Sequence, residues 1–111
     1  MAPVDGCLFV YGTLMEPRER ARLLGREIEA SAATLHGFER GHSRHFYVIR
    51  KPGAQVAGAI LRGLEARDLA ILDEYEDVPK LYTREMIDVA DAGGRGVRCW
   101  IYLPAPSARG G

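Results

Sequence analysis

The sequence predicts an α+β fold, a small curved sheet or barrel of about five to six strands accompanied by two helices. Short apolar segments with strand character recur along the chain and outnumber the helical patterns. Glycines such as Gly58 and Gly63 stand beside these segments, where they mark bends or close backbone approach in a curved sheet.

The N-terminal half contains one predicted helix among strands. Cys7–Tyr11 is an apolar segment typical of a first strand. Glu16–Leu24 predicts a helix, because Pro17 stands near its start and Gly25 is available to cap its end. Strands are then expected at Glu27–Leu35, Ser43–Ile49 and Val56–Leu61. The second of these is expected to end near Lys51-Pro52-Gly53, a turn sequence.

The C-terminal half contains a second helix and a hairpin. Leu64–Glu76 is the clearest helical pattern in the chain. Tyr82–Val89 and Val97–Leu103 predict a final hairpin, joined across residues 91–96. The tail, residues 104–111, is expected to be frayed.

The composition is that of a soluble globular protein, with 47% hydrophobic and 27% charged residues. We expect a single domain over residues 1–111, with its core at about 7–103. Fifteen basic and fifteen acidic residues cancel, which argues against a nucleic-acid or membrane partner. No segment has the pattern of a signal peptide or the length of a membrane span. Cys7 and Cys99 are expected to be buried free thiols, and a cytoplasmic location fits best.

The second predicted helix directs one carboxylate toward the core. A rotation of about 100° per residue places Leu69, Leu72 and Tyr75 on one side of the helix. Glu76 falls between the two leucines on that apolar side. Glu74 falls on the opposite side, where solvent is expected.

An inward-facing Glu76 has two explanations. The first is structural, with the carboxylate paired to a cation such as Arg84 or Arg62. The second is chemical, because a carboxylate in apolar surroundings has a raised pKa that suits general acid/base work. The pattern nominates Glu76 and leaves both explanations open.

A second feature, Tyr11-Gly12-Thr13-Leu14, follows the first strand directly. Gly12 interrupts the apolar run and allows successive backbone N–H groups to point into one concavity. Such a concavity attracts anions such as a carboxylate. The alternative is an ordinary tight turn in which Tyr11 packs in the core.

These features, together with Tyr82-Thr83-Arg84, resemble the γ-glutamylcyclotransferase-like family, as a small, bacterial-type single-domain member. Members carry a Tyr-Gly-Ser/Thr-Leu loop after the first strand. The second glutamate of Leu72-Asp73-Glu74-Tyr75-Glu76 stands at the family's catalytic position. The likeness covers roughly Leu8 to Leu103 and implies a small mixed β-barrel with two flanking helices.

The resemblance also implies a reaction. The α-amine of a small γ-glutamyl substrate attacks the γ-amide, which releases 5-oxoproline and an amine or amino acid. Glu76 would be the catalytic acid/base, with neither cofactor nor metal. The implied substrate-binding residues are Tyr11, Gly12, Thr13, Leu14, Tyr82 and Tyr102.

The chain departs from the family's pattern at two places. Asp77 stands where members often have Gly, although Asp tolerates left-handed backbone better than most residues. Arg44-His45-Phe46-Tyr47 occupies a segment that often carries an aromatic-Pro pair near the pocket entrance. The identity of the leaving amine is therefore not predicted. The sequence also leaves the oligomeric state open.

Other classes of function remain open. One is a non-catalytic binding module in which Glu76 only accepts or donates a hydrogen bond. Another is an RNA or protein adaptor that uses the basic, aromatic stretch Arg40–Lys51, although alternate strand residues face opposite ways and split such a patch. A metal site is not expected, because the spacing matches no strong zinc pattern and the local glycines indicate a loop. The residues considered for it are His36, Glu39, His42 and His45.

Overall fold

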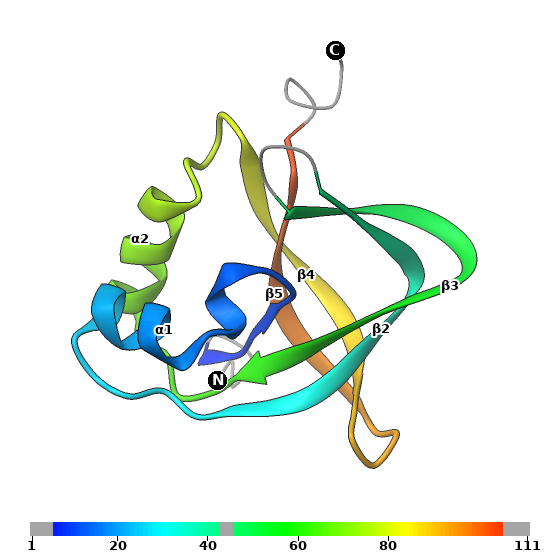
Figure 1. The fold of residues 1–111 in the computed structure, drawn as a ribbon, viewed down its shortest axis with the longest axis horizontal. Coiled ribbons are helices and arrows are strands. Elements are labelled where there is room, and N and C mark those ends of the chain that lie inside the picture. The colour runs from blue at the N-terminus through cyan, green and yellow to red at the C-terminus, as the bar shows by residue number, and fades with distance from the viewer. Residues whose placement is uncertain (1–5, 43–45, 106–111) are drawn as a thin grey trace.

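The structure, a computed structural model, describes residues 6–42 and 46–105, and within them five strands close into a barrel in the order β1-β3-β2-β4-β5. β1 pairs in parallel with β5, and the other neighbouring pairs are antiparallel. This mixed barrel with two α-helices confirms the predicted α+β fold (Figure 1). The elements are β1 (Leu8–Val10), a 3₁₀ helix (Thr13–Met15), α1 (Pro17–Leu24), β2 (Ala30–His42), β3 (Phe46–Leu61), α2 (Ala66–Tyr75), β4 (Tyr82–Asp91) and β5 (Gly96–Pro104).

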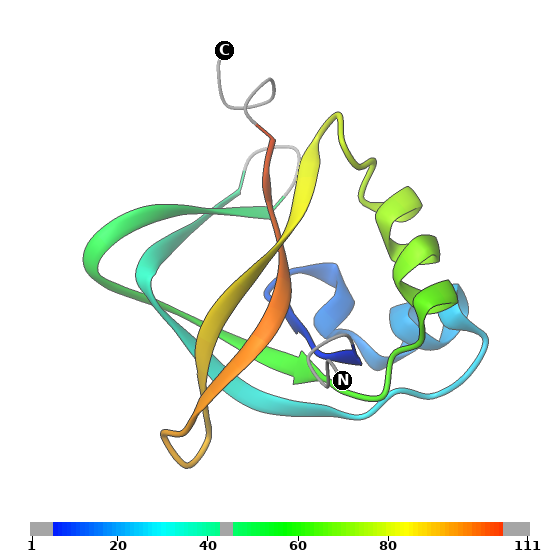
Figure 2. The ribbon, with the colours of Figure 1, turned by 180° about the vertical axis from the view of Figure 1, so that it is seen from behind.

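The core has two parts, which share β1. Both ribbon views place α1 and α2 together on one side of the barrel (Figures 1 and 2). Because alternate residues of a strand face opposite ways, Phe9 and Tyr11 join the buried cluster inside the barrel. Leu8 and Val10 join the cluster beneath the helices. The short first strand therefore connects the barrel interior to the helical layer.

β2 and β3 form one long curved hairpin, and two expectations about it were wrong. Lys51-Pro52-Gly53 lies within β3 and is not a turn between two strands. His36–His42, expected as a loop, belongs to β2. The pairing shifts register between His36 and Phe38, so the Pro-Gly sequence makes a bulge that bends the hairpin instead of ending it. The glycines with left-handed backbone at this shift are Gly37 (φ 84°) and Gly53 (φ 86°).

The remaining elements agree more closely with the predictions. Gly25 caps α1 in the left-handed conformation (φ 75°), and β4 and β5 form the predicted hairpin. The frayed tail was predicted to begin too early. Pro104 ends β5, and Ala105 is buried with its N–H donating to the Leu81 carbonyl at 2.9 Å. Residues 106–111 lie outside the described part of the chain.

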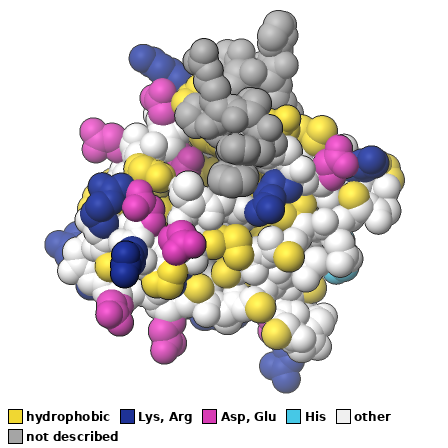
Figure 3. Space-filling model, viewed as in Figure 1, with side chains coloured by type: hydrophobic (Ala, Val, Ile, Leu, Met, Phe, Trp, Pro, Cys, Tyr) yellow, Lys and Arg dark blue, Asp and Glu magenta, His cyan; other side chains and the backbone are white. Residues whose placement is uncertain are grey.

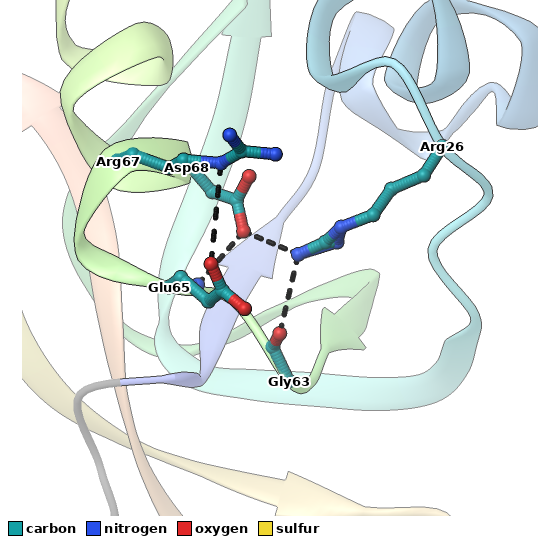
Figure 4. Close-up of polar contacts among 5 residues, drawn as sticks. All are labelled: Arg26, Gly63, Glu65, Arg67 and Asp68. Carbon is teal, nitrogen blue, oxygen red and sulfur yellow. Dashed lines mark hydrogen bonds and ion pairs between the residues drawn. The ribbon is translucent and has the colours of Figure 1, made fainter.

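The N-terminus of α2 is anchored by a buried carboxylate. Glu65 and Asp68 form a capping box, in which the Asp68 side chain accepts the Glu65 N–H at 2.8 Å. Arg26 donates to the same Asp68 carboxylate and to the Gly63 carbonyl (Figure 4). Asp68 is fully buried, so this ion pair ties α2 to the segment between α1 and β2. The anchor fixes the axis of α2, the helix that Glu76 directly follows.

Both signs of charge are mixed on the face of the molecule that Figure 3 shows. Basic and acidic side chains are interspersed over the face that contains α1 and α2, in keeping with the zero net charge (Figure 3). None of the helices in the described residues has the length and apolar character needed to cross a membrane. Cys99 is buried as predicted, whereas Cys7 is only half-buried, and both are free thiols. The single-domain organisation and the cytoplasmic location stay predictions.

Candidate active site

Glu76 follows the last residue of α2 and is turned toward the barrel. Its N–H closes the helix by donating to the Leu72 carbonyl at 2.8 Å. The next residue, Asp77, has a left-handed backbone (φ 58°), as its tolerance for that conformation predicts. The Glu76 side chain is half-buried, and burial raises the pKa of its carboxyl from 4.5 to about 7. This side chain has the inward direction that the helical periodicity predicts.

Three tyrosines from different elements lie around Glu76. Tyr11 follows β1, Tyr82 begins β4 and Tyr102 lies near the end of β5, and all three are buried. Burial is the main cause of a raised pKa in each, reaching about 12 for Tyr82, and the charge of Glu76 raises all three further. The fold therefore brings together these four residues, which the sequence separates widely, and keeps the phenols protonated at neutral pH.

The hydroxyl groups of two of these tyrosines donate to protein acceptors. Tyr11 donates to the Tyr102 carbonyl at 2.5 Å. Tyr102 donates to Oδ1 of Asp73 at 2.7 Å. Tyr11 is thus a core residue whose hydroxyl has a hydrogen-bond acceptor, as the tight-turn alternative predicted. It also lies close enough to Glu76 for the charge of that carboxylate to raise its pKa.

Arg84 pairs with Asp73, which corrects both predicted partners. Its Nε and Nη2 donate to the two Asp73 carboxylate oxygens at 2.7 and 3.1 Å. Its guanidinium lies over the Trp100 ring, 4.3 Å from the centroid. The structural explanation of Glu76 had paired it with Arg84 or Arg62. Arg62 contacts Cys7 instead. Arg84 therefore neutralises Asp73, the carboxylate to which Tyr102 donates.

In the loop Tyr11-Gly12-Thr13-Leu14, the backbone is better placed to bind a ligand than the side chains are. The Leu14 side chain is buried beneath the helices, and Thr13 is exposed. Within the described residues, no acceptor takes the backbone N–H of Gly12, Thr13 or Leu14. Three adjacent donors are thus available in the segment where the sequence predicted an anion-binding concavity.

Tyr75 differs from its predicted place on the apolar side of α2. The side chain is 38% exposed, and its hydroxyl lies 3.2 Å from Oγ1 of Thr13. Leu69 and Leu72 occupy the apolar side as predicted. Tyr75 therefore links the end of α2 to the loop instead of filling the core.

The model of one protein family, described as gamma-glutamyl cyclotransferase, AIG2-like, matches residues 8–111. The chain belongs to this family. AIG2-like protein C of Arabidopsis thaliana is 39% identical over 85 residues, which are 74% of this chain and 48% of that protein. Gamma-glutamylaminecyclotransferase of Bos taurus is 33% identical over 117 residues, 95% of this chain and 67% of that protein. A solution structure of an Arabidopsis thaliana protein superimposes with a TM-score of 0.82 and 25% identity, covering 93% of this chain and 70% of that one.

The chain is shorter than many of these relatives. It spans about half the length of several curated ones, namely 45%, 48% and 55%. The similarity therefore establishes the gamma-glutamyl cyclotransferase, AIG2-like family and its fold.

In this AIG2-like chain, sequence reasoning missed one side chain near the loop. Arg40, from the curved part of β2, donates from Nη1 to the Tyr11 carbonyl at 2.8 Å. The sequence placed Arg40 in a basic, aromatic stretch, and no signal there identifies a backbone carbonyl as its partner. Arg50 of the same stretch lies over the Phe38 ring, 4.9 Å from the centroid.

The other features of that stretch are only partly described. Arg44 and His45 lie outside the described residues, as does the side chain of His42. Among the residues that the structure describes, no three His, Cys, Asp or Glu side chains gather closely enough to hold a metal ion. Glu39, considered as a ligand, pairs with Lys51 at 3.3 Å.

Proposed function

We propose that this chain is a γ-glutamylcyclotransferase-like enzyme acting on a γ-glutamyl amine, amino acid or peptide. The α-amine of the γ-glutamyl group attacks its own γ-carbonyl, and a new carbon–nitrogen bond closes the ring. The bond to the leaving nitrogen then breaks, which gives 5-oxoproline and an amine or amino acid. One proton leaves the attacking amine and one reaches the leaving nitrogen, so a single acid/base group balances the reaction without a cofactor.

Glu76 is our candidate for this group, and its raised pKa of about 7 is the observation that carries the proposal. A terminal amine has a pKa of about 8, so proton transfer to an ordinary glutamate, at about 4.3, is uphill by roughly 5 kcal/mol. Transfer to a carboxylate with a pKa of about 7 is uphill by only about 1.4 kcal/mol. Burial of Glu76 thus removes most of the cost of the first proton transfer.

The other residues around Glu76 have supporting roles in the proposal. The N–H groups of Gly12, Thr13 and Leu14 would hold the substrate's α-carboxylate or the developing oxyanion. Tyr11, Tyr82 and Tyr102 would wall the site, and their raised pKa values leave Glu76 as the base at neutral pH. Because both reacting groups belong to one molecule, holding them in contact supplies much of the remaining rate.

The test is 5-oxoproline release from a panel of γ-glutamyl amines, amino acids and peptides. Wild type should release 5-oxoproline from at least one member, and Glu76→Gln should be at least about a hundredfold slower on it. Glu74→Gln is the matched control, because Glu74 is exposed on the same helix and should leave the rate unchanged. Circular dichroism checks that both variants are folded.

Two outcomes would contradict the proposal. Equal rates of 5-oxoproline release by wild type and Glu76→Gln would show that Glu76 is not the acid/base group. No release from any member, with a γ-glutamyl ligand still bound by the folded protein, would favour a non-catalytic binding module that uses the same residues.

A further inference from the structure

The two cysteines of the chain face each other across the seam that closes the barrel. The seam is short, because β1 and β5 pair in parallel only through Leu8↔Trp100 and Phe9↔Ile101. Cys7 directly precedes β1 and Cys99 directly precedes Trp100, so the same register extended by one residue sets the two cysteines opposite each other. The Trp100 N–H donates to the Cys7 carbonyl at 2.9 Å. Both side chains face the barrel interior, where Cys99 belongs to the buried cluster and Cys7 packs against it.

The spacing of the two strands fits the Cα–Cα separation found in disulfides. Neighbouring strands lie about 4.8 Å apart. Bridged cysteines have Cα atoms about 4.4–6.8 Å apart, with side chains directed to the same side. Opposed residues on neighbouring parallel strands fall within this Cα range, and both cysteine side chains pack in the same interior cluster.

The two thiols differ in exposure and in neighbours. Cys7 is half-buried, and its Sγ accepts a hydrogen bond from Nη1 of Arg62 at 3.9 Å. Cys99 is fully buried, and burial first, then the adjacent Cys7, raises the pKa of its thiol to about 12. An oxidant from solvent therefore meets Cys7 first, beside a guanidinium, whereas Cys99 is protected from solvent and in reach of Cys7.

We propose that Cys7 and Cys99 form a reversible dithiol site that a hydroperoxide oxidises to a disulfide. The sulfur of Cys7 attacks the peroxide, the oxygen–oxygen bond breaks, and Cys7 becomes a sulfenic acid as the peroxide is reduced to water or an alcohol. The sulfur of Cys99 then displaces the hydroxyl from Cys7, which leaves as water with the Cys99 proton. Two electrons pass from the thiol pair to one hydroperoxide, and a dithiol reductant reverses the change.

The bond would tie the barrel at one of its two shortest strand pairings. β1 leads directly into Tyr11 and the loop, and β5 continues from Cys99 to Tyr102. A covalent link between these strands restricts the unfolded chain over almost its whole length, which is the arrangement in which a disulfide stabilises most. Oxidation should therefore stabilise the barrel directly beneath the residues around Glu76.

The experiment treats purified, reduced protein with hydrogen peroxide and follows free thiols, intact mass and disulfide-linked peptides. Wild type should lose both thiols together, lose two hydrogen atoms in mass, and give one peptide pair joined through Cys7 and Cys99. Dithiothreitol should restore both thiols. The oxidised protein should unfold roughly 10 °C higher than the reduced one.

Two variants separate the roles of the cysteines. Cys99→Ala should stop at a sulfenic acid on Cys7 that a dimedone-type reagent traps, and Cys7→Ser should keep Cys99 reduced under the same treatment. Oxidation of wild-type Cys7 to a sulfinic acid with Cys99 still a thiol would overturn the proposal. So would a disulfide between two chains, or loss of the Cys99 thiol in Cys7→Ser at the wild-type rate.

Discussion

At the scale of single residues, the buried carboxyl of Glu76 makes the stability of the protein depend on pH. Below the ordinary pKa of 4.5 the group is protonated in both the folded and the unfolded chain. Between 4.5 and about 7 only the folded chain keeps the proton, so the free energy of unfolding falls as the pH rises through this range. Above it, the buried carboxylate costs about 3 kcal/mol.

Denaturant titrations between pH 4 and pH 8 check this prediction. Glu76→Gln should match wild type at pH 4 and be more stable by about 3 kcal/mol at pH 8. The exposed Glu74→Gln should follow wild type throughout. A constant difference between Glu76→Gln and wild type across this range would contradict the raised pKa.

Arg40 contacts the loop at the carbonyl group of Tyr11. A trans peptide directs its carbonyl and its N–H in opposite directions, so the bond from Arg40 to the Tyr11 carbonyl turns the Gly12 N–H away from Arg40. If Gly12 holds the substrate, as proposed, Arg40→Ala should lower kcat/KM for 5-oxoproline release roughly tenfold through lost positioning. Arg40→Lys should recover part of the loss.

Arg50→Ala is the matched control for Arg40. Arg50 lies on the paired strand and stacks on Phe38 without contacting the loop, so its removal should leave kcat/KM unchanged. Equal losses in Arg40→Ala and Arg50→Ala would show that the basic stretch acts through its charge alone.

At the scale of elements, a half-buried ion pair joins α2 to the β4–β5 hairpin beside their shared apolar cluster. Arg84 on β4 holds Asp73 on α2 with both groups largely screened from water, and Tyr102 shares the same carboxylate. Arg84→Ala leaves Asp73 without its cation, so it should destabilise the protein by about 2 kcal/mol. Arg98→Ala breaks an exposed pair with Asp88 on the same hairpin and should cost under about 0.5 kcal/mol.

Chemical denaturation of the two arginine variants measures both costs. The comparison is matched, because each substitution removes an arginine that donates two hydrogen bonds to an aspartate. Equal destabilisation would mean that burial of the Arg84 pair adds nothing to the attachment of α2.

Elements whose signals are local could be predicted from the sequence. The periodicity of α2 identified Leu69 and Leu72 as buried and Glu76 as inward-facing, because one helix turn decides all three. Gly25 marked the end of α1 because only a residue without a side chain adopts that backbone at no cost.

Features that depend on distant partners could not be predicted. The Pro-Gly sequence in β3 has ordinary turn chemistry, and only pairing with β2 on both sides of it converts the turn into a bulge. Arg40 and Arg84 were visible as cations, but their acceptors, the Tyr11 carbonyl and Asp73, are set by the closed barrel. Tyr75 follows the helical period and is exposed because the loop, not the core, lies opposite it.

At the scale of the whole molecule, the strands are unequally supported. β1 pairs with β3 only at residues 59–61, and β4 pairs with β2 only at Ala33 and Thr34. Between residues 36 and 55, the described parts of β2 and β3 pair only with each other, as the curved ribbon in Figures 1 and 2 shows. A two-stranded ribbon is marginally stable by itself. Buried Phe38 and Val48, together with Arg40, attach this one to the barrel.

Amide hydrogen exchange should therefore divide the molecule into two regions. Amides of β2 and β3 between residues 36 and 55 should exchange by local opening, roughly tenfold or more faster than those of β5 at Trp100 and Ile101 in the seam. Arg40→Ala should accelerate exchange in the ribbon and leave the seam unchanged, because the bond that it removes joins the ribbon to Tyr11. Uniform protection across both regions, or acceleration of both by Arg40→Ala, would mean that ribbon and barrel open as one cooperative unit. In that case Arg40 would stabilise the whole fold, and its effect on kcat/KM would follow the fraction of folded protein instead of the position of the loop.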